Sequence, residues 1–129
     1  MPISPLNKRY IPAIAWFFLT LYLLTLPGSA FPKEDWFEKI QLDKWVHIAL
    51  FVTLTTLCYM PFLPIQSPSF LGWPAVLIAL SILAYGIIME FVQKYLIPFR
   101  SFDIGDIAAD GMGCLMGYIA LRWKCRTSA

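Results

Sequence analysis

Four apolar runs, each bounded by proline, glycine or charged residues, occupy most of the chain and restrict the folds that it can adopt. They cover about residues 10–26, 44–63, 73–97 and 103–123. A helix needs about 20 apolar residues to cross the hydrocarbon core of a bilayer, so the last three runs are long enough and the first is at the lower limit. The sequence therefore predicts an all-α fold, a four-helix transmembrane bundle that forms one domain over residues 1–129.

Composition favours a membrane protein and argues against other classes. Hydrophobic residues make up 59% of the chain and charged residues only 14%, against roughly 25% charged in soluble domains. The net charge of +2 comes without a basic tract, so nucleic acid is not expected as a partner. The three cysteines are odd in number and lack C-x-x-C spacing, so we expect neither a disulfide nor a structural zinc. Interfacial aromatic anchors are expected near the ends of the runs, at Tyr10, Trp45, Trp73, Tyr95 and Trp123.

The first run also has the layout of a secretory signal. Lys8 and Arg9 precede it, and the small residues Gly28-Ser29-Ala30 follow it. Its length and its bulky Trp16-Phe17-Phe18 segment instead favour a helix that is retained in the mature protein.

The orientation follows from the distribution of basic residues. An even number of helices puts both termini on one side, and Lys and Arg are balanced between the two sides. Lys8 and Arg9 precede the first helix, which usually dominates topology, whereas Lys44, Lys94 and Arg100 stand next to acids that can neutralise them. We therefore expect both termini in the cytoplasm and the polar loops outside.

A row of acids at the start of the last run is the strongest functional signal. Asp103, Asp106 and Asp110 stand at i, i+3 and i+7, which puts three carboxylates on one face of a helix. Ionisable groups in a membrane-spanning helix tend to face the bundle interior and indicate a functional site. An N-cap role explains Asp103 and part of Asp106. It does not explain Asp110, which lies about 10 Å further along the axis.

The predicted topology brings other polar residues to the same end of the bundle. His47 is the one histidine in the chain and shares a helical face with Asp43, an arrangement that can orient an imidazole as a base or metal ligand. Glu90 follows a long apolar run and would be costly to expose to lipid. We predict catalytic roles for His47, Asp43, Glu90, Asp106 and Asp110, and substrate binding by Arg100, Lys44, Lys94, Gln93 and Asp103.

Two interpretations of these charges stay open. The five carboxylates and three bases could form a structural network that locks the bundle. They could instead form a ligand or catalytic site, with Arg100 and Lys94 holding a phosphate or carboxylate. The acids would then act as proton donors or acceptors, or bind a divalent cation through oxygen. The cofactor, the presence of a metal, the oligomeric state and catalysis itself all stay undetermined at this stage.

Two further patterns predict structure rather than chemistry. Gly105, Ala109, Gly113 and Gly117 recur at four-residue spacing, so this face of the last helix should pack closely against a neighbour. Residues 33–39 are expected to form a solvated loop or a short interfacial helix.

Three separated motifs resemble those of the VanZ-like family of small bacterial membrane proteins. The second run opens with Asp43-Lys44-x-x-His47, and the third closes with Glu90-x-x-Gln93. The last begins with Arg100-x-x-Asp103-x-x-Asp106-x-x-x-Asp110-x-x-Gly113. The resemblance covers about residues 43–117 and implies the cell envelope and the inner membrane, but no particular reaction. The family is named for a member associated with resistance to the glycopeptide teicoplanin. Asp110 departs from the usual asparagine and adds a negative charge or a proton at depth.

Three functions are compatible with the residues and with this resemblance. The first is a membrane-embedded enzyme or carrier-type site that acts on an envelope lipid or lipid-linked precursor from the outer face, with His47 as a general base oriented by Asp43. Lipid phosphatases with two catalytic histidines are disfavoured, because the chain has one. The second is a module that binds such a lipid, or an antibiotic target, without turnover. The third is a structural membrane subunit.

Overall fold

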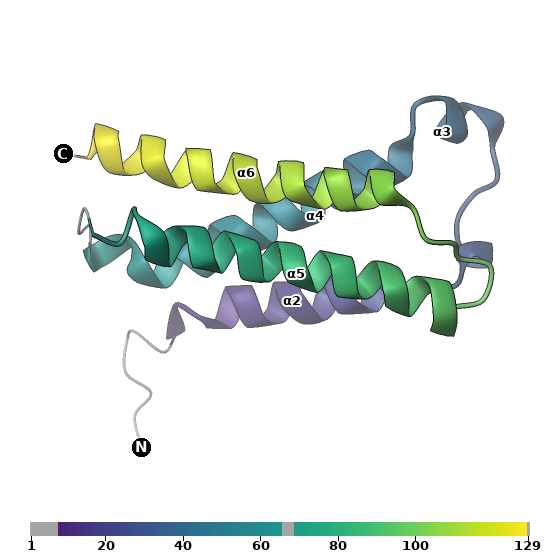
Figure 1. The fold of residues 1–129 in the computed structure, drawn as a ribbon, viewed down its shortest axis with the longest axis horizontal. Coiled ribbons are helices and arrows are strands. Elements are labelled where there is room, and N and C mark those ends of the chain that lie inside the picture. The colour runs from purple at the N-terminus through teal and green to yellow at the C-terminus, as the bar shows by residue number, and fades with distance from the viewer. Residues whose placement is uncertain (1–7, 66–68, 129) are drawn as a thin grey trace, which may run out of the picture.

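The computed structural model describes residues 8–65 and 69–128, which form an antiparallel bundle of helices without a strand (Figure 1). This confirms the all-α prediction, although residues 1–7, 66–68 and 129 of the predicted domain lie outside the described part. The four long helices are α2 (Ile11–Leu24), α4 (Leu42–Tyr59), α5 (Trp73–Leu96) and α6 (Ile104–Thr127). Their connections contain the short helix α3 (Asp35–Lys39) and the 3-10 turns η1 (Gly28–Ala30) and η2 (Met60–Ile65).

Three of the described helices are long and apolar enough to cross a membrane: α4 continued into η2, α5, and α6. Helix α2 is shorter than predicted. Its 14 residues span about 21 Å at 1.5 Å per residue, less than the hydrocarbon thickness of about 30 Å. It ends at Leu24, before Leu26 and Pro27, because a proline disfavours helical geometry in the residue before it.

The outer surface of the bundle is more apolar than that of a water-soluble helical bundle. Large apolar side chains such as Ile88 on α5 and Ile119 on α6 are exposed, as expected of surfaces that face lipid. The interior contains an apolar core around Phe51 and Leu54, together with buried polar residues. These buried polar residues are Thr20, His47, Thr55, Glu90, Gln93, Asp106 and Asp110.

The predicted aromatic anchors lie near the helix ends and are exposed. Trp73 begins α5 and Trp123 is close to the end of α6, at one end of the bundle (Figure 1). Trp45 near the start of α4 and Tyr95 near the end of α5 lie at the opposite end. Two aromatic levels separated by apolar helix surface are typical of membrane proteins.

Helix α6 packs closely on α4 through the predicted ridge of small residues. A Cβ atom added at Gly113 would lie 2.8 Å from the backbone oxygen of Ile48 and 2.9 Å from the backbone nitrogen of Val52. A Cβ atom at Gly117 would lie 2.8 Å from the side chain of Thr55. Larger residues would force the two helices apart, so the ridge sets how near the carboxylates of α6 come to α4.

The loop after α2 contacts the link between α5 and α6. The backbone N–H of Gly28 donates to the carbonyl of Pro98 at 3.1 Å, and a Cβ atom at Gly28 would collide with the carbonyl oxygen of Phe99. Phe99 has a φ of 59°, a left-handed conformation that is rare for a bulky side chain. The contact brings the following residue, Arg100, close to Phe31 in the loop after α2, with the guanidinium 5.1 Å from the ring centre.

A candidate polar site at one end of the bundle

His47 lies inside the bundle, where α4 faces α6. Its side chain is buried, and its Nδ1 atom lies 2.8 Å from Oδ1 of Asp110, which is also buried. The sequence predicted Asp43 as the partner of this imidazole. That pairing is wrong, because Asp43 lies at the exposed start of α4, where it contacts Lys44. The glycine ridge of α6 instead brings Asp110 against the ring.

Lys44 is the cation of an ion-pair cluster at the ends of α4 and α6. Its Nζ atom lies 2.8 Å from a carboxylate oxygen of Asp103, 3.3 Å from one of Asp43 and 3.4 Å from one of Asp106. These three acids therefore share one ammonium group. This part of the site fits the structural-network interpretation, since the cluster ties two helices together without a ligand.

Asp103 caps α6, as the sequence suggested. Its Oδ1 atom accepts a hydrogen bond from the backbone N–H of Gly105 at 2.7 Å, which satisfies one of the free amides of the first turn. The hydrogen bond from Lys44 and this backbone N–H together lower the pKa of the Asp103 carboxyl. Its role in holding the helix end is clear from these contacts, while substrate binding by Asp103 stays a prediction.

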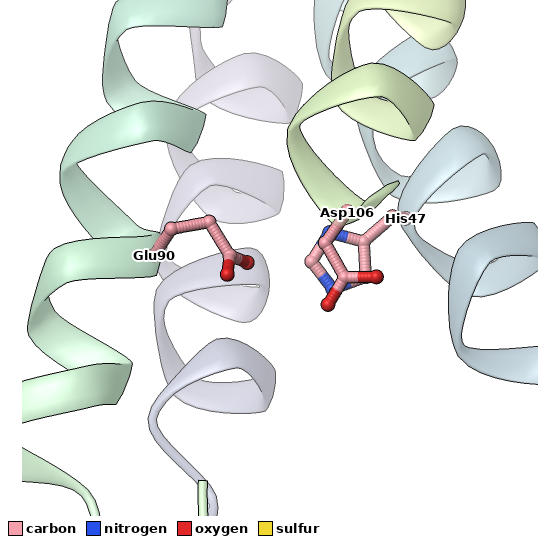
Figure 2. A group of neighbouring side chains, drawn as sticks. All are labelled: His47, Glu90 and Asp106. Carbon is pink, nitrogen blue, oxygen red and sulfur yellow. The ribbon is translucent and has the colours of Figure 1, made fainter. Parts of the chain in front are cut away.

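Glu90 reaches the site from α5. One carboxylate oxygen, Oε2, accepts the backbone N–H of Asp103 at 3.0 Å. The other oxygen, Oε1, is buried and has no hydrogen-bond partner among the described residues. Figure 2 shows the carboxylate pointing across the bundle toward His47 and Asp106, which come from α4 and α6.

A cavity of about 390 Å³ opens next to these groups, at the end of the bundle that carries α3. His47 and Asp106 line it from the interior, and Arg100 lines it from the link between α5 and α6. Leu23, Leu24 and the neighbouring side chains of α4 supply apolar surface. The cavity thus combines a buried acid–imidazole pair, a guanidinium and an apolar wall.

Several predicted residues have other surroundings. Lys94 is exposed, with its ammonium over the rings of Tyr95 and Phe102 at 5.1 Å and 5.9 Å, and it does not line the cavity. Gln93 lines the cavity, and its amide donates to the carbonyl of Leu24 at 2.9 Å, which joins α5 to the end of α2. Asp110 lies behind His47 and does not line the cavity.

Sequence reasoning did not identify three other lining residues: Phe31, Glu38 and Ser101. Phe31 supports the guanidinium of Arg100, and Glu38 extends from α3. None of them lies within an apolar run, where a polar residue would indicate a functional site. Phe31 and Ser101 lie next to the contact between the loop after α2 and the link between α5 and α6, which sequence spacing does not reveal.

Two sets of potential metal ligands occur among the described residues. The first contains His47, Glu90 and Asp106, and the second contains Asp43, Asp103 and Asp106. Within each set, one donor atom from every residue lies within 4.8 Å of the others. Lys44 forms ion pairs with all three acids of the second set, whereas in the first set the described part of the chain shows it paired only with Asp106.

These features define a multi-pass helical membrane protein with a polar site enclosed by three helices. The sequence matches the VanZ/LLP1 family over residues 10–124, so the chain belongs to this family. The match extends beyond the motifs that first suggested the resemblance and includes α2. No curated protein and no solved structure matches the chain.

Proposed function

We propose that the protein binds the phosphate-bearing head group of an envelope lipid or lipid-linked precursor in the cavity at the α3 end, and acts on it there. One observation carries this proposal. Arg100 lines the same cavity as His47 and Asp106, and its guanidinium forms no ion pair with any described residue. A lone arginine beside a polar cavity is well suited to an anionic ligand.

The residues that line the cavity are suited to a phosphate group attached to a lipid. Arginine binds phosphate through two parallel N–H donors, a geometry that a lysine ammonium does not provide. The nearby Lys44 is already shared by three carboxylates, which leaves Arg100 for the ligand. Leu23, Leu24 and Leu50 can contact the apolar stem of a lipid whose head group lies near the bundle end.

His47 is the candidate base. Nδ1 lies 2.8 Å from Oδ1 of Asp110, and in the tautomer that carries its proton on Nδ1 the lone pair of Nε2 faces Asp106 beside the cavity. An imidazole held in this way can take a proton from water or from a hydroxyl group of the ligand. Asp110 therefore has the positioning role that we predicted for Asp43 from the sequence.

The orientation in the membrane is part of the same proposal. Lys8 and Arg9 before α2 favour both termini in the cytoplasm, which puts the cavity at the outer face of the inner membrane. A substrate there would be an envelope lipid or a precursor of the cell wall. A contribution to glycopeptide resistance would follow from a change in the amount or form of such a precursor.

The test compares two variants that each remove one positive charge. Purified Arg100→Gln and Arg122→Gln proteins are reconstituted in nanodiscs and titrated with a fluorescent polyprenyl phosphate. Arg122 lies on α6 at the opposite end of the bundle and serves as the matched control. Loss of a charge-assisted hydrogen-bonded contact of about 1.5–3 kcal/mol should weaken binding by Arg100→Gln about 10- to 150-fold. Equal affinity of both variants would refute a phosphate site at Arg100.

Turnover distinguishes an enzyme from a binding module. Wild-type protein and His47→Gln are incubated with the same labelled lipid, and the products are separated by chromatography. Product formed by wild type and not by His47→Gln supports catalysis. Tight binding without product by wild type favours the alternative, which is a module that sequesters an envelope lipid. Loss of folding in all site variants, with no lipid binding by wild type, favours a structural subunit.

A further inference from the structure

Three donor atoms from three different helices face one another beside the cavity. They belong to His47 on α4, Glu90 on α5 and Asp106 on α6, and all lie within 4.8 Å of one another (Figure 2). The Nε2 atom of His47 lies 3.7 Å from Oδ2 of Asp106. Ligands bound to one metal ion at about 2.0–2.2 Å lie roughly 3–4 Å apart, so this spacing fits two ligands of one ion.

Glu90 supplies an observation that is independent of the clustering. Its side chain is 1% exposed, its Oε1 atom has no hydrogen-bond partner in the described chain, and the carboxylate points toward the other two residues. A buried carboxylate oxygen without a partner is costly. A bound cation would satisfy it.

The imidazole is oriented as a metal ligand would be. Nδ1 lies 2.8 Å from Oδ1 of Asp110. In the tautomer that carries its proton on Nδ1, this nitrogen donates to Asp110 and Nε2 presents a lone pair toward Asp106. A carboxylate behind the imidazole fixes the tautomer and ring orientation in many metal sites. Nε2 and Oδ2 of Asp106 are 3.7 Å apart, too far for a hydrogen bond, and a metal ion that binds both atoms fits this separation.

The remaining charges leave room for a metal ion at this position. Lys44 contacts the outer oxygen of Asp106, Oδ1, at 3.4 Å, and the oxygen facing His47 is the other one, Oδ2. Lys44 therefore contacts the trio of His47, Glu90 and Asp106 only through Oδ1 of Asp106, and among the described residues it forms no ion pair with Glu90.

We infer that His47, Glu90 and Asp106 bind one divalent metal ion of the zinc and manganese class, with its open coordination positions toward the cavity. One nitrogen and two carboxylate oxygens suit these ions better than magnesium, which prefers oxygen ligands and retains its waters. Three protein ligands with an open position are typical of a catalytic rather than a structural site. The inference deepens the proposed function but rests on its own contacts. With the ion bound, Nε2 of His47 is a ligand and no longer a general base, so the ion would take over that role beside the cavity that Arg100 lines.

Metal content tests the site without any lipid or activity. Protein purified in detergent is stripped with chelator, incubated separately with ZnCl₂, MnCl₂ or MgCl₂, desalted, and analysed by mass spectrometry for bound metal. We expect wild type to retain about one zinc per chain, manganese more weakly and magnesium least, following the general affinity order. Glu90→Gln should retain none. Glu38→Gln is the matched control, because Glu38 lines the cavity on α3 but belongs to neither ligand set.

Cobalt provides a second readout for the coordination itself. Co²⁺ added to wild type should give visible absorption bands with a nitrogen–oxygen ligand set, and Glu90→Gln should lack them. Wild-type protein that is folded by circular dichroism and retains no metal overturns the inference, even if Glu90→Gln fails to fold. Equal metal retention by folded Glu90→Gln and Glu38→Gln also overturns it. Loss of lipid binding with metal binding intact would refute the proposed function and leave the metal site in place.

Discussion

Replacement of Gly113 by alanine should separate α6 from α4 and destabilise the protein. The added Cβ atom would lie 2.8 Å from the backbone oxygen of Ile48 and 2.9 Å from the backbone nitrogen of Val52. Ordinary van der Waals contact begins at 3.4 Å, so the helices must move apart by roughly half an ångström. Backbone atoms within a helix cannot rotate away as the end of a side chain can.

The expected cost is about 1–3 kcal/mol, the usual range for overpacking a tightly packed interior. Gly111 offers a matched control on the same helix, because a Cβ atom there would meet only the side chain of Leu83 at 3.7 Å. Gly111→Ala should be neutral or stabilising by up to about 1 kcal/mol, since alanine favours a helix more than glycine does. The two alanine variants should therefore differ by about 1–4 kcal/mol.

The assay is equilibrium unfolding in mixed detergent micelles with increasing sodium dodecyl sulfate, followed by far-ultraviolet circular dichroism. Gly113→Ala should unfold at a lower denaturant fraction than wild type, and Gly111→Ala at the same or a higher one. Equal midpoints for the two variants would refute the close packing of α6 on α4, and with it the position of Asp110 against His47.

Three further predictions concern single side chains. Lys44 lowers the pKa of Asp103, so the ion pair stabilises the folded protein fully above the unfolded pKa of about 3.9, and this stabilisation is lost as pH falls through the lower folded pKa. When the pH is lowered below about 4, the unfolding midpoint of wild type should therefore decrease more than that of Asp103→Asn. Parallel pH dependences of the two midpoints would contradict this. Trp16→Phe removes the 3.0 Å hydrogen bond to the carbonyl of Leu50 and should cost about 1 kcal/mol in the same unfolding assay, with no change as the contradictory result. Asp110→Asn should stay folded but bind zinc about 10- to 100-fold more weakly in a chelator competition titration, as is typical when a partner behind a ligand is altered; unchanged affinity would remove its positioning role.

Sequence signals predicted the order and character of the helices because these depend on local properties. Apolar runs and prolines indicated where α4, α5 and α6 lie. The boundaries were less accurate where local signals are weak. Helix α6 continues to Thr127, past the predicted end at Trp123, because Lys124 and Arg126 are exposed and interact favourably with the C-terminal end of a helix. Helix α2 ends two residues early, where Pro27 approaches.

Helical spacing predicted that acids of α6 share one face, but the sequence did not predict which residues they contact. Spacing on one helix placed Asp103, Asp106 and Asp110 on a common face, and they do engage α4. The partner of His47 depends on the register of α6 against α4, which Gly113 and its neighbours set through space. The rotation of α5 about its own axis likewise directs Lys94 away from the cavity, and the sequence pattern does not specify that rotation.

The most direct measurement of the central claim is the position of a zinc ion in a crystal structure of the protein in lipid, located by anomalous scattering. The account predicts one anomalous peak within about 2.0–2.2 Å of Nε2 of His47 and of carboxylate oxygens of Glu90 and Asp106. A peak elsewhere, or these three side chains directed away from one another in a fully folded protein, would contradict the account.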